Sequence, residues 1–164
     1  MNINKYQKIF GVGPIGLLIS FVLLVVFWLV DRGLGHVKIL SQPALSTAAG
    51  LSLLVIWIGW HASAIRTIRT WWDRDRLCTS GPYRFVRHPM YAGAVFLVAP
   101  AVALLFNSWV IFLWPVFLYP VWSFLVRHEE KMMLAFFGDD YRRYAARTGR
   151  LFPRVVRLDR IAGN

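Results

Sequence analysis

Four long stretches without any Lys, Arg, Asp or Glu dominate this chain of 164 residues and limit what it can fold into. They cover residues 11–30, 44–65, 90–106 and 109–126. A helix needs about 20 apolar residues to cross the ~30 Å hydrocarbon core of a bilayer. We therefore expect an all-α integral membrane protein with about four transmembrane helices.

The overall composition supports this fold class. Hydrophobic residues make up 57% of the chain and charged residues only 16%, whereas soluble domains carry roughly 25% charge. This balance excludes a disordered chain and a coiled coil, and it disfavours an ordinary soluble domain. The single cysteine, Cys78, has no partner for an internal disulfide, which excludes a disulfide scaffold.

We expect one membrane domain, residues 1–164, rather than separate domains. The last two apolar stretches are separated only by Asn107-Ser108, a turn signal that predicts a tight C-terminal helical hairpin. The C-terminal segment is expected to contain a cytoplasmic amphipathic helix. The expected parts are two N-terminal spans within residues 1–65, a cytoplasmic loop at 66–89, the hairpin at 90–126 and a cytoplasmic segment at 127–164.

The basic residues predict the orientation of the four spans. Seventeen of the nineteen Lys and Arg residues lie before the first stretch, between the second and third, or after the fourth. The positive-inside rule then places both termini in the cytoplasm, in the inner membrane if the source is prokaryotic. The net charge of +11 is explained by contact with anionic membrane lipids, so we expect no nucleic-acid partner and see no sign of an obligate protein partner.

The start of the first stretch contains two misleading patterns. The stretch is longer than the ~7–15 apolar residues of a signal peptide, so we expect it to be retained as a span. Residues 11–16 also match G-x-G-x-x-G, but a dinucleotide site needs a strand before the glycines and a βαβ unit around them. The polar segment before Gly11 and the apolar helix after it favour a membrane span instead.

Polar chemistry gathers first where the loop at 66–89 meets the third stretch. Pro89 suits the first turn of a helix, which places Arg87 and His88 at its N-terminus, where backbone N–H groups favour an anion. Arg87 has the donors to clamp a carboxylate or phosphate. Each residue also has a plain structural interpretation, as a headgroup anchor for Arg87 and a helix cap for His88.

The second polar segment follows the fourth stretch. Glu129 and Glu130 lie at the expected membrane boundary and need partners there, either nearby arginines or a cationic or hydroxyl-bearing ligand. An apolar and aromatic stripe shares helical spacing with Glu130 and predicts the buried face of a helix, with a break at Gly138-Asp139-Asp140. The stripe comprises Met133, Phe137, Tyr141 and Tyr144, and the basic tail that follows comprises Arg147, Arg150, Arg154, Arg157 and Arg160.

Because both polar segments flank one hairpin, we expect them to meet at the same cytoplasmic mouth. An anion site, carboxylates, tyrosines and an apolar wall together suit a zwitterionic aromatic ligand such as S-adenosylmethionine. We expect no metal site, because the histidines and Cys78 show no ligand spacing on one helix face. His61, inside the second stretch, is a weaker site candidate.

The order of these motifs resembles the isoprenylcysteine carboxyl methyltransferase family and its phospholipid N-methyltransferase relatives. R-H-P-x-Y-x-G is present at residues 87–93, E-E at 129–130, F-G-x-x-Y-x-x-Y at 137–144 and R-x-x-P at 150–153. The resemblance covers residues 79–153. It implies a membrane-embedded methyltransferase that uses S-adenosylmethionine and has no separate soluble nucleotide-binding domain.

The resemblance also implies which residues form the site. It assigns cofactor binding to Tyr83, Arg87, His88, Tyr91, Gly93, Glu129, Glu130, Tyr141, Tyr144 and Arg150. As catalytic residues we predict Arg87, His88 and Glu130. Arg87 would orient the acceptor or the cofactor carboxylate, and Glu130, like Glu129, would bind the cofactor ammonium or ribose. His88 is the one evident base.

The acceptor is expected to be a lipophilic or membrane-associated small molecule that reaches the site laterally between spans. The resemblance implies an isoprenylcysteine-type carboxyl as the acceptor. The chemistry of the site residues alone does not distinguish between carboxyl, amine, thiol and hydroxyl acceptors. Two alternatives stand beside this prediction. One is a non-catalytic membrane binding or assembly protein of the same fold, and the other is an enzyme that acts on phospholipid headgroups.

Overall fold

The computed structural model of the chain describes residues 11–71 and 76–154. Within these residues the fold is helical and contains no strand, only two isolated β-bridges. Four helical units are long and apolar enough to cross a membrane, namely Gly13–Gly33, Pro43–Trp71, Pro89–Phe106 and Trp109–Arg147. The predicted fold class, an all-α integral membrane protein with four spans, is confirmed. Lys5, Lys8, Arg74, Arg157 and Arg160, which the orientation argument used, lie outside the described residues.

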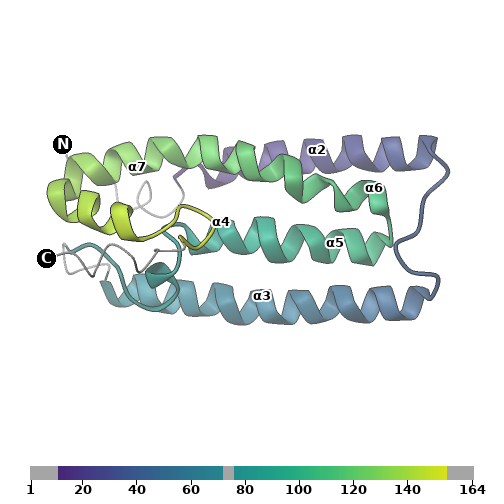
Figure 1. The fold of residues 1–164 in the computed structure, drawn as a ribbon, viewed down its shortest axis with the longest axis horizontal. Helices are drawn as coiled ribbons and strands as arrows, with labels where there is room; N and C mark the ends of the chain where they lie inside the picture. The colour runs from purple at the N-terminus through teal and green to yellow at the C-terminus, as the bar shows by residue number, and fades with distance from the viewer. Residues whose placement is uncertain (1–10, 72–75, 155–164) are drawn as a thin grey trace, which may run out of the picture.

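The first two spans are the single helices α2 (Gly13–Gly33) and α3 (Pro43–Trp71), which lie on opposite sides of the bundle in Figure 1. The second span was expected to end at residue 65, but α3 continues six residues further. Hydropathy marks where a helix leaves the hydrocarbon and not where its backbone hydrogen bonds stop. The extra turns carry Ile68 and Trp71 to the site described below.

The third span is one continuous helical unit made of three pieces. It comprises α4 (Pro89–Gly93), a π-helical turn η2 (Ala94–Val98) and α5 (Ala99–Phe106). Pro89 occupies its first turn, as the sequence predicted, because a residue without an N–H is tolerated there. A short 3₁₀ helix, η1 (Gly81–Arg84), precedes it.

The predicted tight hairpin at Asn107-Ser108 is confirmed. Asn107 adopts a left-handed conformation with φ of 50°, and Ser108 caps α6 (Trp109–Phe112) by accepting the Ile111 N–H at 3.1 Å. The buried Asp31 of α2 accepts the Ser108 hydroxyl at 2.5 Å. The hairpin turn is therefore joined to the end of the first span.

The fourth span continues as α7 (Trp114–Arg147) well beyond residue 126, where the hydropathy ends. The predicted break is confirmed at Gly138, whose φ of 52° and ψ of −123° are not helical. Only glycine adopts such a conformation readily. After the kink the chain folds back toward the start of α4 (Figure 1).

Close packing of small residues against aromatic ones holds the spans together. Gly16 of α2 lies against the indole of Trp122, so that an added Cβ would come within 2.4 Å of the ring. The Trp122 Nε1–H donates to Ser20 at 3.1 Å across the same contact. Small residues at such contacts let helices in a membrane approach closely.

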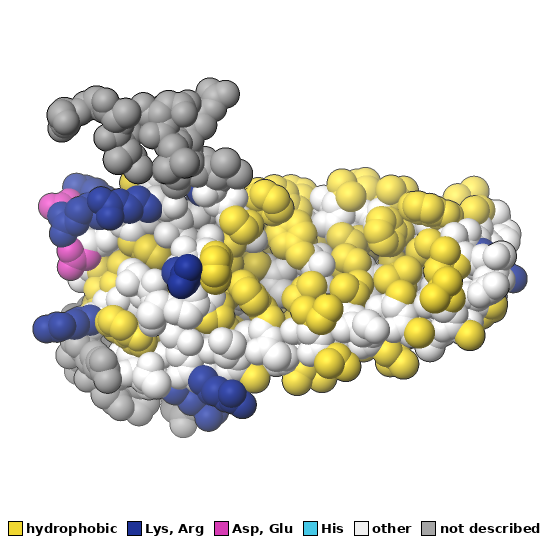
Figure 2. All heavy atoms as spheres, turned by 60° about the horizontal axis from the view of Figure 1, so that its bottom comes forward, with side chains coloured by type: hydrophobic (Ala, Val, Ile, Leu, Met, Phe, Trp, Pro, Cys, Tyr) yellow, Lys and Arg dark blue, Asp and Glu magenta, His cyan; other side chains and the backbone are white. Residues whose placement is uncertain are grey.

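The surface of the bundle is apolar along its length and charged at one end. Figure 2 shows hydrophobic side chains along most of the length of the bundle, while most of the Lys and Arg side chains in this view lie at one end. Exposed large hydrophobic residues are frequent in α2, α3 and α7. Such a surface suits contact with lipid rather than water.

Candidate functional site

The two polar segments predicted to meet are joined by backbone hydrogen bonds. The Arg87 N–H donates to the Gly149 carbonyl at 2.8 Å, and the His88 N–H donates to the Arg150 carbonyl at 3.1 Å. An isolated parallel bridge pairs Val86 with Gly149. The residues after α7 are thereby held against the start of the third span, as the hairpin argument predicted.

Glu130 lies between two arginines at the centre of this junction. Its Oε1 accepts from Arg87 Nε at 2.8 Å and from Nη2 at 2.6 Å, and its Oε2 accepts from Arg150 Nε at 2.9 Å and from Nη2 at 2.6 Å. Arg87 Nη1 donates to the carbonyls of Ala145 and Thr148. Protein acceptors therefore take four of the five Arg87 N–H groups. The arrangement matches the structural interpretation of Glu130, pairing with nearby arginines, rather than a free clamp for a ligand.

Glu129 points in a different direction from its neighbour, because successive residues on a helix are about 100° apart. Its Oε1 accepts from the Val12 N–H at 2.8 Å and from the Tyr91 hydroxyl at 2.8 Å, and its Oε2 lies 3.4 Å from His88 Nδ1. Val12 begins α2, so the carboxylate also faces the positive end of that helix dipole.

His88 is enclosed between both carboxylates and is only 9% exposed. Its Nε2 lies 3.5 Å from Glu130 Oε1, an ion-pair distance without hydrogen-bond geometry, which leaves this nitrogen without a hydrogen-bond partner. Burial alone would lower the pKa of His88, but Glu129 and Glu130 outweigh it and raise the pKa above its usual value. The imidazole is thus held toward its protonated form, while its role as a base stays a prediction.

Aromatic rings complete the junction. His88 stacks on Tyr91 with ring centres 5.9 Å apart, and Tyr91 stacks on Trp122 at 4.6 Å. The Tyr144 hydroxyl donates to the Tyr83 carbonyl at 2.6 Å. By contrast, the hydroxyl of Tyr141 is buried and finds no hydrogen-bond partner in the described part of the chain.

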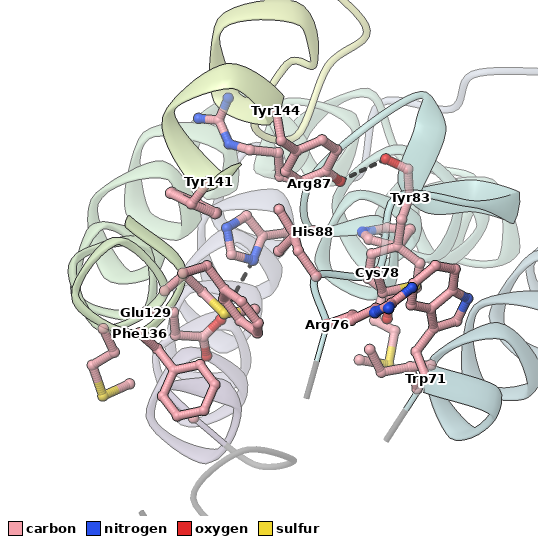
Figure 3. Close-up of a pocket in the computed structure, with 18 of the residues that line it drawn as sticks. Trp71, Arg76, Cys78, Tyr83, Arg87, His88, Glu129, Phe136, Tyr141 and Tyr144 are labelled. Atoms are coloured by element: carbon pink, nitrogen blue, oxygen red, sulfur yellow. Dashed lines mark hydrogen bonds and ion pairs between the residues drawn. The ribbon is translucent and has the colours of Figure 1, made fainter. Parts of the chain in front are cut away.

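These groups surround a cavity of about 200 Å³. In Figure 3, Glu129, His88 and Tyr141 form one side of it, and Trp71, Arg76 and Cys78 lie on the other side. Burial raises the pKa of the Cys78 thiol, so that Cys78 contributes an uncharged wall. The apolar part of the lining consists of Ile68, Leu77, Met90, Met132, Met133, Phe136 and Phe137.

Seven of the ten predicted cofactor-binding residues line this cavity, namely Tyr83, Arg87, His88, Tyr91, Glu129, Tyr141 and Tyr144. The other three do not. Glu130 and Arg150 pair with each other beside the cavity. Gly93 faces α3, where an added Cβ would come 3.1 Å from the rings of Trp57 and Trp60, so its place fits helix packing.

The predicted stripe on α7 lies in the cavity lining. Met133, Phe137, Tyr141 and Tyr144 all line the cavity, with Tyr141 buried and Met133 38% exposed. The kink at Gly138 rotates the second half of the stripe relative to the first.

Sequence reasoning missed several cavity residues at the ends of other elements. Gly11, dismissed together with the false dinucleotide pattern, lines the cavity, and an added Cβ there would lie only 1.8 Å from Glu129 Oε1. Ile68, Trp71 and Arg76 arrive from α3 and the residues after it. The segment at the end of α3 mixes apolar and polar residues and has no sequence pattern that predicts a site. It reaches the cavity because α3 extends beyond the apolar stretch.

Comparison with known proteins agrees with the fold and with the motifs. A search of curated proteins found no significant match. The sequence profile of the phospholipid methyltransferase family matches residues 44–140, which is more than half of the chain and includes α3, the third span, both glutamates and the kink. The chain therefore belongs to the phospholipid methyltransferase family and is an integral membrane methyltransferase.

Proposed function

We propose that the chain transfers a methyl group from S-adenosylmethionine to a lipophilic acceptor at the cavity described above. The observation that carries the proposal is the buried Tyr141 hydroxyl, which belongs to a residue lining this cavity and has no hydrogen-bond partner among the described residues. Buried polar groups are nearly always satisfied, so a polar ligand is the expected partner. Membership of a methyltransferase family calls for a methyl donor.

The donor set fits this cofactor. Glu129 is the carboxylate that lines the cavity, and it would hold the cofactor ammonium or ribose hydroxyls. The Tyr141 hydroxyl would donate a hydrogen bond to an acceptor atom of the cofactor. S-adenosylmethionine supplies an activated methyl group on a sulfonium, so that the protein has mainly to align the acceptor with it.

We assign Arg87, Glu130 and Arg150 a positioning role rather than direct contact with a substrate. Their mutual hydrogen bonds join the start of the third span to the residues after α7. This junction fixes His88 and Tyr141 on one side of the cavity. Rigid support of this kind keeps reacting groups within the narrow limits that transfer needs.

For the acceptor we propose an isoprenylcysteine-type carboxylate. A carboxylate is ionised at neutral pH and needs no base, which suits a site whose histidine is held toward its protonated form between Glu129 and Glu130. The apolar lining from α3 and α7 would contact the hydrocarbon of the acceptor. A phospholipid headgroup amine is the second candidate, favoured by the description of the matching family.

The orientation belongs to the same proposal. We place both termini and the cavity on the cytoplasmic side, because the arginines gather at that end (Figure 2). A single cysteine introduced at exposed Arg84, with Cys78 replaced by Ala, would react with an impermeant maleimide only in inside-out vesicles. Labelling in right-side-out vesicles would reverse this orientation.

Calorimetric binding of S-adenosylhomocysteine to the detergent-purified protein tests the cofactor, with Glu129→Gln as the site variant and the exposed Arg142→Gln as the control. We expect micromolar binding that the site variant loses and the control keeps. Absence of binding by the folded wild-type protein would refute the cofactor proposal. Transfer of labelled methyl groups to an S-farnesylated cysteine derivative, compared with phosphatidylethanolamine, then distinguishes the two acceptors.

A further inference from the structure

A second hollow lies beside the cavity and has a different chemistry. It is a cleft of about 560 Å³ with four arginines in its lining, Arg76, Arg84, Arg143 and Arg147. The hydroxyl-bearing Thr79 and Thr148 also line it. The only acidic residue in its lining is Asp140, so the charge of the described part of the cleft is strongly positive.

Within the described part of the chain, one of these arginines has an acidic partner. Asp140 is taken by Arg143 at 2.5 Å. Among the described residues, Arg76, Arg84 and Arg147 have no acidic partner. Several guanidinium groups around one hollow repel each other unless an anion lies between them, and their planar donors match the oxygens of a phosphate.

The surroundings of the cleft favour a lipid over a soluble anion. Its lining also contains the apolar side chains of Trp71, Leu77 and Phe137. At its edge the guanidinium of Arg84 lies 4.8 Å from the ring centre of Phe85, which is 48% exposed. An exposed aromatic residue beside a cation, at the end of a bundle of spans, is typical of the membrane interface.

From these contacts we propose that the arginine cleft binds the phosphate of an anionic phospholipid headgroup, as a site separate from the methyl-transfer cavity. Basic hollows between spans on the cytoplasmic side recognise such headgroups. The cleft and the cavity share part of one wall, formed by Trp71, Arg76, Leu77, Phe137 and Tyr144. A bound headgroup therefore touches residues that also face the cavity, and lipid composition is expected to influence the affinity for the methyl donor.

Native mass spectrometry of the full chain, with phosphatidylglycerol and phosphatidylcholine of equal acyl chains, tests this inference without relying on activity. The cleft variant is Arg84→Gln/Arg147→Gln, because these residues line the cleft and not the cavity. The control, Arg127→Gln/Arg142→Gln, removes the same charge from exposed positions outside both hollows. The wild-type protein should prefer phosphatidylglycerol, and the cleft variant should lose this preference by about tenfold or more.

The control variant should keep the preference. An equal loss of the preference for phosphatidylglycerol in both variants would mean that general surface charge causes it, and would overturn the proposed site. A wild-type protein that shows no preference would overturn it as well. Displacement of the lipid by millimolar glycerol 3-phosphate would assign the cleft to a soluble phosphate compound and overturn the lipid. Unchanged binding of S-adenosylhomocysteine in phosphatidylcholine confirms that the cleft variant is folded, and keeps the result separate from the proposed methyl transfer.

Discussion

The guanidinium of Arg87 donates from both Nε and Nη2 to a single oxygen of Glu130, at 2.8 and 2.6 Å. Both side chains are nearly buried, with exposed fractions of 11% and 12%. The pair connects the start of the third span with the end of the fourth. It explains how two segments more than forty residues apart form one wall of the cavity.

Replacing Glu130 by Gln should destabilise the protein strongly, because Arg87 would keep a buried charge without its partner. We expect a loss of about 3 kcal/mol in the free energy of unfolding, seen as a lower thermal midpoint in detergent. The exposed pair Arg142–Asp139, with exposed fractions of 70% and 72%, is the control. Asp139→Asn should change the midpoint little, and an equal fall in both variants would contradict the buried role of Glu130.

His88 should make the stability depend on pH. Its pKa is raised in the folded protein by Glu129 and Glu130, so its contribution is complete below the unfolded value of about 6.5 and is lost as the pH rises through the folded value. The thermal midpoint of the wild-type protein should therefore fall as the pH rises above 6.5, and His88→Gln should remove that part of the slope. His128→Gln, at an exposed position, should keep the slope; equal slopes in all three proteins would refute the assignment.

Gly11→Ala should disturb the carboxylate that we assign to the cofactor. The new Cβ would overlap Glu129 Oε1 and displace it from the Val12 N–H. We expect binding of S-adenosylhomocysteine to weaken by about tenfold, the effect of losing one hydrogen bond to a charged group. Gly13→Ala is the control because its Cβ would meet Tyr91 only at 3.5 Å. Similar affinities in the two variants would separate this end of α2 from the site.

Tyr141 and Tyr144 should respond differently to loss of their hydroxyl groups. The Tyr141 hydroxyl has no partner within hydrogen-bond geometry among the described residues, whereas that of Tyr144 donates to the Tyr83 carbonyl. Tyr141→Phe should leave the thermal midpoint unchanged and weaken cofactor binding. Tyr144→Phe should lower the stability by about 1 kcal/mol. Unchanged calorimetric affinity in Tyr141→Phe would show that its hydroxyl does not contact the cofactor.

Gly16→Ala tests the packing of the first span against the fourth. The added methyl group would lie 2.4 Å from the Trp122 ring, and such overpacking costs about 1–3 kcal/mol. Gly59→Ala has open space around it and should be neutral or stabilising, since alanine favours a helix. Denaturation in mixed micelles measures both variants. A stable Gly16→Ala protein would mean that this contact is loose.

The sequence by itself determined the architecture. Uncharged stretches of sufficient length can only be satisfied in a bilayer as helices, so the four spans, the turn at Asn107-Ser108, the Pro89 start and the Gly138 break followed from local chemistry. The motifs also identified seven of the residues that line the cavity, because their order along the chain resembled that of a known family.

Only the tertiary structure decided which of these residues face the cavity. Glu129 and Glu130 are equivalent in the sequence, yet one lines the cavity and the other pairs with two arginines, because the rotation of α7 directs adjacent side chains to different neighbours. Neither the place of Gly11 in the cavity nor the arginine cleft was predicted, and the cleft is formed where the end of α3 meets the part of α7 near the kink. Contacts between distant segments depend on helix length, rotation and bending, which local residue patterns do not encode.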